Sequence, residues 1–278
     1  MLPNLIIIGG QKCGTTSLHH YLSRHPAIFM SRTKELNFFC PARNASRGRA
    51  WYEAQFPVDR PVRGEASPHY TNYPFEPGVP ARMHALLPQA RLMYLVREPV
   101  ARILSHYVHW VGEGQETRSL EEALADFESS PYLTRSRYAW QLEQYLAVYP
   151  PEQVLVITTE ELHDQRAATL RRVFRFLGVD ESFTCAAFAR QLYRARDQRR
   201  LTPLGRAVAA VTRRLASPQW PPGLVWRLKH LPYPALSRPV PVPVMPPKLA
   251  TAVREFLRPD RERLRALTGR DFPEWEAA

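Results

Sequence analysis

Residues 6–22 read IIIGGQKCGTTSLHHYL, and this stretch decides the fold. The aliphatic run at residues 5–8 ends in two glycines, which is typical of a buried parallel strand that enters a tight turn. Residues 16–24 predict the helix that follows. A glycine-rich turn between a strand and a helix gathers backbone N–H groups and the positive end of the helix dipole around one point. The stretch therefore predicts a phosphate-binding loop.

The loop differs from the phosphate loop of ATPases in the position of its lysine. A Walker A loop reads G-x-x-x-x-G-K-S/T, whereas residues 9–15 read GGQKCGT, so that Thr15 stands where the lysine should be. Lys12 lies inside the loop instead. We expect it to face the 5′ phosphate of a nucleotide and the group that this phosphate carries. The alternative, a glycine-rich turn with a surface lysine, is disfavoured by the aliphatic strand before the loop and the Thr-Thr-Ser after it.

A second strand-turn-helix motif follows at residues 91–110. RLMYLV at 91–96 predicts a buried strand, and Pro99 suits the first turn of a helix over 99–110. Arg97 lies at the carboxyl end of the strand, where open α/β sheets bind ligands, and Ser105 follows about two helical turns later. Such an Arg and Ser can bind a second phosphate. The alternative is a surface pair of Arg97 with Glu98 and a solvent-facing Ser105.

The rest of the chain predicts strands that alternate with helices. A third buried strand is expected at 154–158 (VLVIT) and a short one at 62–65. Helices are expected at 120–127, 138–149, 167–177 and 247–257. This alternation indicates a parallel sheet covered on both faces. We therefore predict one P-loop-like domain over residues 1–278, with a three-layer α/β/α architecture and a central, mostly parallel sheet.

Residues 217–247 interrupt this pattern, because 10 of these 31 residues are proline. Proline excludes regular helix and central strand over most of the segment. Its apolar residues, Trp220, Trp226, Leu231 and Tyr233, favour an extended strap that lies over the domain. The alternative is a disordered linker.

Composition limits the classes of partner. The formal net charge is +12, which suggests an anionic ligand. The basic residues are spread along the chain, and no zinc finger, RNA-recognition signature or long basic helix accompanies them, so we do not expect nucleic acid. No apolar run reaches the length of a membrane helix, and the N-terminal residues lack the basic region of a signal peptide. We expect a cytoplasmic catalytic domain without an anchor. Three cysteines form no metal or disulfide framework.

The two phosphate motifs together resemble those of the sulfotransferases that use 3′-phosphoadenosine 5′-phosphosulfate (PAPS). QKCGTTSL is similar to the 5′-phosphosulfate loop of this family, and LVREPVARILSHY is similar to its 3′-phosphate site. TKELNFFC (33–40), GEASPHY (64–70) and FLRPDRERLRALTGRDFPEW (256–275) resemble its heparan-sulfate and bacterial branch. The resemblance covers residues 4 to about 178 and about 246 to 275, whereas residues 180–245 match weakly.

The resemblance implies a role for each matching residue. Lys12 would stabilise the bridging oxygen and the leaving phosphate, and Glu35 would be the general base. Arg97 and Ser105 would bind the 3′ phosphate. The loop around the 5′ phosphosulfate would consist of Gln11, Lys12, Cys13, Gly14, Thr15, Thr16 and Ser17.

The chain departs from the branch at two positions near these residues. Ala66 stands where a lysine is common, and Asn37 stands where a histidine or another polar residue is common. The class of acceptor is therefore open. Glu35 has an alternative role as a surface ion-pair partner of Lys34, in which case His20 or His69 would be the next candidate for the base.

The predicted reaction is transfer of the sulfuryl group from PAPS to a hydroxyl of a small-molecule, glycolipid or carbohydrate acceptor. In-line geometry and charge stabilisation suffice for such a transfer, so we expect no metal. The alternative function is that of a P-loop kinase or NTPase. It requires a Walker lysine and a strand that ends in a Mg²⁺-binding aspartate, but RLMYLV is followed by Arg-Glu and VLVIT by Thr-Glu.

Overall fold

A five-stranded parallel sheet forms the centre of the computed structural model, which describes residues 1–189, 199–215 and 235–276. Its strand order is β2-β3-β1-β4-β5. The strands are β1 (Leu5–Gly9), β2 (Ile28–Met30), β3 (Val62–Ala66), β4 (Arg91–Val96) and β5 (Val154–Thr158). Every residue of β1 is buried, which explains why this strand is aliphatic throughout rather than alternating.

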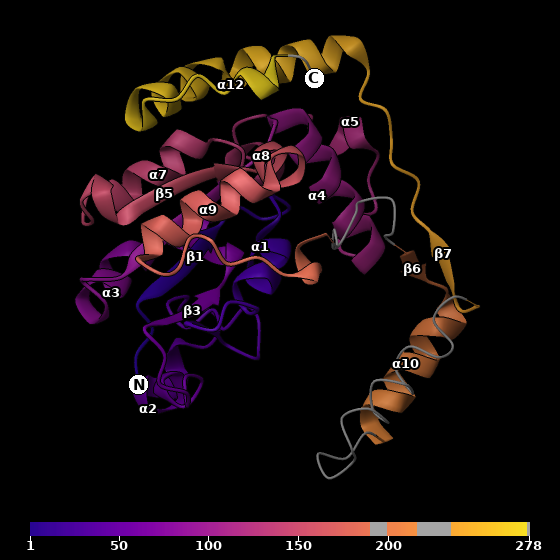
Figure 1. Cartoon of the computed structure of the whole chain (residues 1–278). Coiled ribbons are helices and arrows are strands. Elements are labelled where there is room, and N and C mark those ends of the chain that lie inside the picture. The colour runs from indigo at the N-terminus through magenta and orange to yellow at the C-terminus, as the bar shows by residue number, and fades with distance from the viewer. Residues whose placement is uncertain (190–198, 216–234, 277–278) are drawn as a thin grey trace.

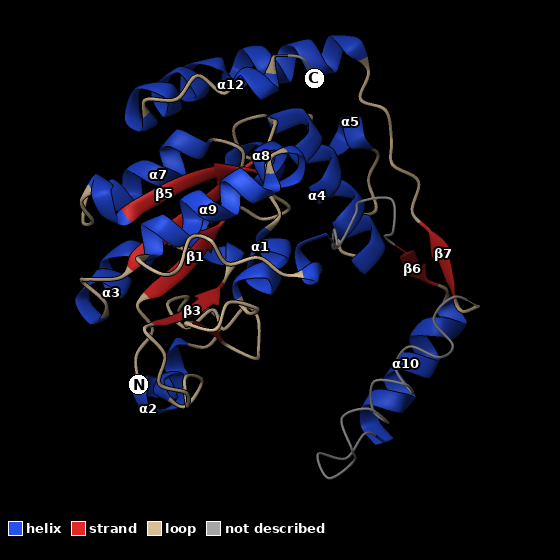
Figure 2. Cartoon of the chain, viewed as in Figure 1, coloured by secondary structure: helices blue, strands red, loops and turns tan. Residues whose placement is uncertain are grey.

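Helices cover both faces of the sheet (Figures 1 and 2). On one face lie α1 (Thr15–Leu22) and α9 (Arg166–Leu177). The ring of His25, which follows α1, packs against the ring of Phe174 in α9, and the two ring centroids are 4.7 Å apart. On the other lie α3 (Val79–Leu86), α4 (Pro99–Glu113) and α7 (Tyr138–Leu146). The predicted three-layer α/β/α architecture is confirmed. The shorter helices are α2 (Gly48–Glu53), α5 (Leu120–Ala123), α6 (Pro131–Thr134) and α8 (Thr159–Asp164).

A long C-terminal helix, α12 (Pro247–Thr268), packs outside α7 and α4 (Figure 1). The sequence predicts that this helix ends at residue 257, and this boundary is wrong. The helix continues through Pro259 because Leu257 and Leu264 are buried against the body on one face. The buried carboxylate of Asp260 accepts the backbone N–H groups of Ala139 and Trp140, each at 3.0 Å, and so caps the start of α7.

Other predicted boundaries differ less. The helix expected over 120–127 begins with a capping box of Ser119 and Glu122 but ends at Ala123. The helix expected over 138–149 ends at Leu146, and α1 begins one residue before its predicted start. The strand β2 was not predicted, because three residues are too few to give a periodic pattern.

The strap predicted over 217–247 falls largely outside the described residues, and its four apolar residues lie in the part that is not described. Within the described remainder, β7 (Ser237–Pro239) pairs antiparallel with β6 (Arg199–Leu201). The chain then runs extended to α12, with the side chains of Val240 and Met245 buried. A further helix, α10 (Pro203–Leu215), follows β6 and projects away from the sheet (Figure 1).

Candidate active site

A cavity of about 830 Å³ lies at the carboxyl ends of β1, β4 and β5, where ligands bind in open α/β sheets. Both phosphate motifs contribute to its wall. Its lining residues are Gln11, Lys12, Gly14, Thr15, Thr16, Ser17, Lys34, Glu35, Arg43, Pro68, His69, Arg97, Ser105, His109, Trp110, Glu113, Gln115, Arg135, Thr159, Glu160, His163 and Asp164.

The first loop has the conformation that its glycines permit. A Cβ on Gly9 would lie 1.9 Å from Thr71 Oγ1, so only glycine fits where β1 ends. Gly14 takes the left-handed conformation, with φ of 89°, immediately before α1 begins. The first N–H groups of a helix have no acceptor within the helix, and here that end of α1 faces the cavity. The loop thus presents donors and a positive dipole to an anion.

Two contacts fix the backbone of this loop. The fully buried Arg102 donates from Nε to the carbonyl oxygen of Gln11 at 3.1 Å. The hydroxyl of Thr159, the first residue of α8, donates to the carbonyl oxygen of Cys13 at 2.9 Å. These contacts turn loop carbonyls away from the cavity, which leaves N–H groups for the ligand.

Cys13 differs from the other predicted loop residues, because it does not line the cavity. Its side chain is fully buried, and its Sγ lies 3.8 Å from the hydroxyl of Tyr138. Burial raises the pKa of the Cys13 thiol to about 11, so the thiol stays neutral. Spacing within a loop does not tell which side chains point inward, and this residue shows the limit of the sequence pattern.

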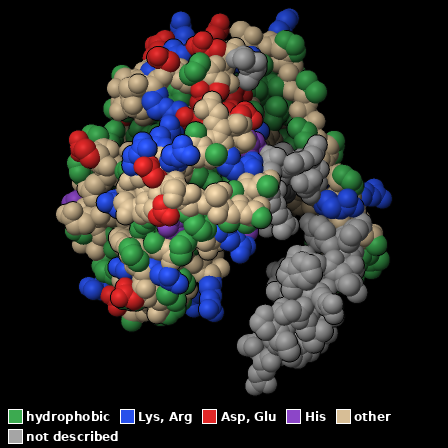
Figure 3. Space-filling model, in the orientation of Figure 1, with side chains coloured by type: hydrophobic (Ala, Val, Ile, Leu, Met, Phe, Trp, Pro, Cys, Tyr) green, Lys and Arg blue, Asp and Glu red, His purple; other side chains and the backbone are tan. Residues whose placement is uncertain are grey.

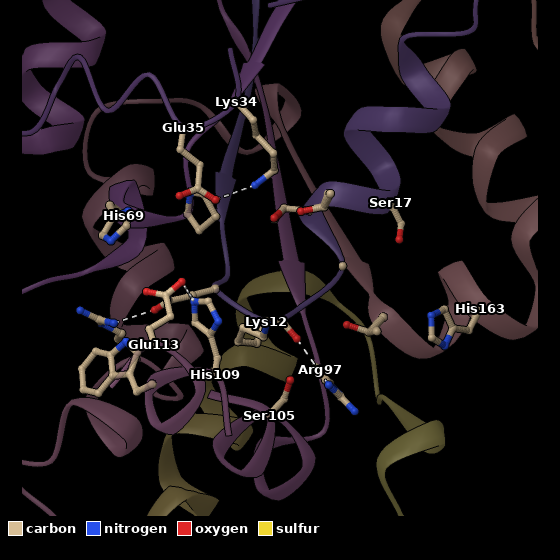
Figure 4. A pocket seen from close by; sticks show the side chains of 18 of the residues that line it. Lys12, Ser17, Lys34, Glu35, His69, Arg97, Ser105, His109, Glu113 and His163 are labelled. Atoms are coloured by element: carbon tan, nitrogen blue, oxygen red, sulfur yellow. Dashed lines mark hydrogen bonds and ion pairs between the residues drawn. The ribbon is translucent and has the colours of Figure 1, made fainter. Parts of the chain in front are cut away.

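Lys12 lies where the two motifs meet (Figure 4). Its φ of 68° is unusual for a residue with a side chain and directs the backbone of the loop. Burial lowers the pKa of Lys12 to about 8, and the charge of Arg97 acts in the same direction. The ammonium therefore lies in a site that favours a bound anion over a second cation.

Arg97 and Ser105 both line the cavity, as the second motif predicts. Arg97 donates from Nη1 to the carbonyl oxygen of Lys12 at 3.5 Å, and its own carbonyl accepts the hydroxyl of Tyr138 at 2.9 Å. Glu98 instead caps α4, where its carboxylate accepts the N–H of Ala101 at 2.6 Å. The alternative surface pair of Arg97 with Glu98 is therefore not formed, and the guanidinium is available to a ligand.

Glu35 lies on the opposite wall of the cavity from Arg97 (Figure 4). Its carboxylate accepts the Lys34 ammonium at 2.8 Å, so the ion pair considered above exists, but within the cavity. Burial opposes ionisation of Glu35, yet the Lys34 charge and hydrogen bond outweigh it, so its pKa is lowered. His69 also lines the cavity, and burial lowers its pKa to about 4. His20 does not line the cavity.

One group of lining residues was not singled out by the sequence. His109 and Glu113 project from α4 toward the wall that carries Glu35, and His109 Nε2 lies 3.6 Å from Glu113 Oε1 (Figure 4). A signal for them exists in the sequence. They follow Ser105 at intervals of four residues, so that one binding residue on this helix face implies the other two.

Arg135 also lines the cavity, but no sequence pattern indicates it, because it lies in the connection between α6 and α7. Its Nη1 donates to Gln11 Oε1 at 2.6 Å and lies 3.2 Å from His106 Nε2. Burial lowers its pKa to about 9, and the charge of Arg102 adds to this. Arg135 thus adds a cation beside the first loop.

The face of the molecule shown in Figure 3 is not uniformly basic. Figure 3 shows Lys and Arg side chains scattered among Asp and Glu on the face in view. Among the residues that the structure describes, no three His, Cys, Asp or Glu side chains gather as a metal site would require. None of the described helices combines the length and apolarity needed to cross a membrane.

Comparison with known sequences agrees with this geometry. The family described as "Sulfotransferase domain" matches residues 2–193, a span that includes both phosphate motifs and Glu35. The chain belongs to this sulfotransferase family. The resemblance seen in QKCGTTSL and LVREPVARILSHY is thereby confirmed.

Individual sulfotransferases support the same family. A bifunctional heparan sulfate N-deacetylase/N-sulfotransferase 2 from Homo sapiens is 30% identical over 203 residues, which cover 64% of this chain and 22% of that protein. A heparan sulfate glucosamine 3-O-sulfotransferase 3B1 from Mus musculus is 28% identical over 286 residues, covering 98% of this chain and 64% of that protein. This chain thus spans less than two thirds of either relative.

A solved structure extends the similarity to the whole fold. The crystal structure of a sulfotransferase from Alicyclobacillus acidocaldarius is 28% identical to this chain, with a TM-score of 0.73. The match covers 99% of both chains.

Proposed function

We propose that this protein transfers the sulfuryl group of PAPS to a hydroxyl of a small-molecule, glycolipid or carbohydrate acceptor. The observation that supports the proposal is that residues of both predicted phosphate motifs and the Glu35 carboxylate line one cavity. Lys12 and the start of α1 would bind the 5′ phosphosulfate, and Arg97 with Ser105 would bind the 3′ phosphate. Glu35 would face the acceptor.

The chemistry of these groups suits an in-line transfer. The acceptor hydroxyl must lose a proton as its oxygen attacks sulfur, and an ionised carboxylate can accept that proton. Negative charge then grows on the departing 5′ phosphate, where the Lys12 ammonium and the loop N–H groups would stabilise it. Because the charges are already in place, little reorganisation is needed during the reaction.

The kinase alternative fits the site poorly. Thr15 occupies the position of the Walker lysine, and neither β4 nor β5 ends in an aspartate that could hold Mg²⁺. Glu98, which follows β4, is engaged in capping α4. Thr159, which follows β5, donates its hydroxyl to backbone carbonyls.

The proposal is tested with the transferred group itself. The protein is incubated with PAPS that carries a radioactive sulfur, together with fractionated extracts and a panel of phenols, glycolipids and oligosaccharides. A labelled product that forms only with the intact protein supports sulfuryl transfer, and its structure identifies the acceptor. Label that appears only as inorganic sulfate across all acceptors would count against the proposal. Label on a nitrogen of the product would show that the acceptor group is an amine rather than a hydroxyl.

Binding of the desulfated product, 3′-phosphoadenosine 5′-phosphate, is expected to raise the melting temperature. A ligand at 100 times its Kd adds about 2.7 kcal/mol to the free energy of unfolding. A thermal-shift titration with this nucleotide, with ATP and with ADP as controls, measures the effect. Stabilisation by ATP but not by the 3′-phosphorylated nucleotide would make the cofactor assignment wrong.

Replacing Arg97 by Ala is expected to weaken binding of the 3′-phosphorylated nucleotide by about 1.5–3 kcal/mol, the range for a hydrogen bond to a charged group. Affinity for adenosine 5′-phosphosulfate, which lacks the 3′ phosphate, should change little, so the preference between the two disappears. Calorimetric titration of both nucleotides on parent and variant gives this comparison. Unchanged affinity for the 3′-phosphorylated nucleotide would remove Arg97 from the site.

A further inference from the structure

The segment GEASPHY contains a buried carboxylate that the proposed chemistry does not use. Glu65, in β3, is fully buried and accepts three hydroxyl groups. Tyr52 and Tyr70 donate to its Oε1 at 2.7 and 2.8 Å, and Ser67 donates to its Oε2 at 2.6 Å. Burial raises the pKa of Glu65, and these three hydrogen bonds act against that rise.

The same hydroxyls hold the loop that carries Glu35. Two non-glycine residues in this loop, Glu35 and Asn37, have positive φ values of 64° and 49°. Such a backbone persists only when its surroundings fix it. Asn37 donates its N–H to Ser67 Oγ at 3.0 Å, and the next residue, Phe38, donates its N–H to the Tyr70 hydroxyl at 2.9 Å.

A third contact comes from the backbone of the same strand. The N–H of Glu35 donates to the carbonyl oxygen of Ala66 at 3.0 Å. The loop therefore donates three backbone N–H groups to acceptors in β3 and just after it. Two of these acceptors are the hydroxyls of Ser67 and Tyr70, which also bind Glu65.

The direction of each hydroxyl proton follows from its partners. A backbone N–H can only donate, so the oxygens of Ser67 and Tyr70 must accept there. Their own protons must go elsewhere, and the carboxylate of Glu65 takes both. Glu65 thus takes the hydroxyl protons of Ser67 and Tyr70, which leaves both oxygens free to accept the N–H groups of the loop.

We propose that Glu65 is a positioning residue, which orients the hydroxyls of Ser67 and Tyr70 and through them aims Glu35 into the cavity. This inference rests on the proposed role of Glu35 as the base. Glu65 itself is buried and does not line the cavity, so it acts only through the loop. Misplacing a catalytic group by about 1 Å can cost about 100-fold in rate, which is why such support matters.

The two tyrosines provide a matched test. Tyr52→Phe and Tyr70→Phe each remove one hydroxyl from the same Oε1 atom, and each keeps its ring. Only the Tyr70 hydroxyl accepts an N–H of the loop. We expect Tyr70→Phe to lower kcat about 10- to 100-fold, and Tyr52→Phe to keep a kcat close to that of the parent. The Kd of 3′-phosphoadenosine 5′-phosphate should be unchanged in both.

The carboxylate is tested through Ser67. In Glu65→Gln, an amide nitrogen beside Ser67 Oγ would donate where the carboxylate accepts, so the Ser67 proton loses its partner. We expect Glu65→Gln and Ser67→Ala to lower kcat by similar factors. The double variant should be no slower than Ser67→Ala alone, because both changes break one chain of contacts. Effects that multiply in the double variant would overturn the proposed route through Ser67.

A measurement without an acceptor separates this inference from the proposed reaction. Amide hydrogen exchange should accelerate at Phe38 in Tyr70→Phe, because Phe38 donates to the Tyr70 hydroxyl, and at Asn37 in Glu65→Gln, because Asn37 donates to Ser67. Exchange at both amides should stay slow in Tyr52→Phe. If the protein transfers no sulfuryl group at all, the exchange pattern still tests the support of the loop. Equal effects of the two tyrosine variants on exchange and kcat would overturn the proposal. If Glu65→Gln fails to fold, the tyrosine pair decides.

Discussion

Glu35→Gln is expected to lower kcat about 10²–10⁴-fold, the usual loss when a general base is removed, with little change in nucleotide affinity. Glutamine keeps the shape of the side chain but cannot accept the acceptor proton. The lowered pKa of Glu35 places its protonation below the ordinary value of 4.5. Activity of the parent should therefore fall as pH drops through that lowered pKa, and this acidic limb should vanish in the variant.

The neighbouring histidine supplies the control for this experiment. His69→Gln changes another group in the same cavity, one whose pKa of about 4 leaves it neutral at physiological pH. It should keep most of the turnover. If Glu35→Gln kept near-parental turnover and His69→Gln lost it, His69 would be the base and Glu35 an ion-pair partner of Lys34. His20, which lies outside the cavity, is no longer a strong candidate.

Lys12→Ala is expected to lower kcat about 10²–10³-fold, as removal of a group that stabilises developing charge does. It should also weaken nucleotide binding, which separates it from Glu35→Gln. The pKa of about 8 adds a pH signature. In the free enzyme the required ammonium is lost as pH rises through 8, so kcat/KM should fall there. Bound PAPS is anionic and favours the charged form, so the corresponding limb in kcat should lie at higher pH.

Lys12→Arg separates charge from geometry. A guanidinium stays protonated over this range, so the basic limb should disappear even if the rate is reduced. Pre-steady-state and steady-state rates over pH 6–10, roughly centred on the Lys12 pKa, would measure both limbs. A Lys12→Ala enzyme with parental kcat and only a raised KM would show that Lys12 binds the ground state and leaves the departing phosphate to other groups.

The central strands and both phosphate motifs could be predicted from the sequence because they depend on local patterns. Buried aliphatic runs and glycine-rich turns have a recognisable spacing, so β1, β4 and the loop before α1 could be predicted. The remaining wall of the cavity depends on tertiary contacts. Arg135 comes from a connection 38 residues after Arg97, and nothing in its local sequence indicates where its side chain points.

The direction of the Cys13 side chain and the length of α12 could not be predicted from local patterns, for related reasons. Cys13 lies between two cavity residues yet points into the core, since its burial depends on Tyr138 from another helix. The helix α12 passes through Pro259, where local rules predict an end, because packing of Leu257 and Leu264 outweighs the lost hydrogen bond. In both cases tertiary packing overrides the local preference.

The cap that Asp260 provides has a practical consequence for choosing domain boundaries. The segment that matches the family ends at residue 193, but the first turn of α7 within it depends on a carboxylate from α12. Tyr138, the first residue of α7, holds the carbonyl of Arg97. A recombinant fragment cut at the family boundary would therefore leave Arg97, the proposed 3′-phosphate ligand, poorly supported, so expression designs need to retain the C-terminal helix.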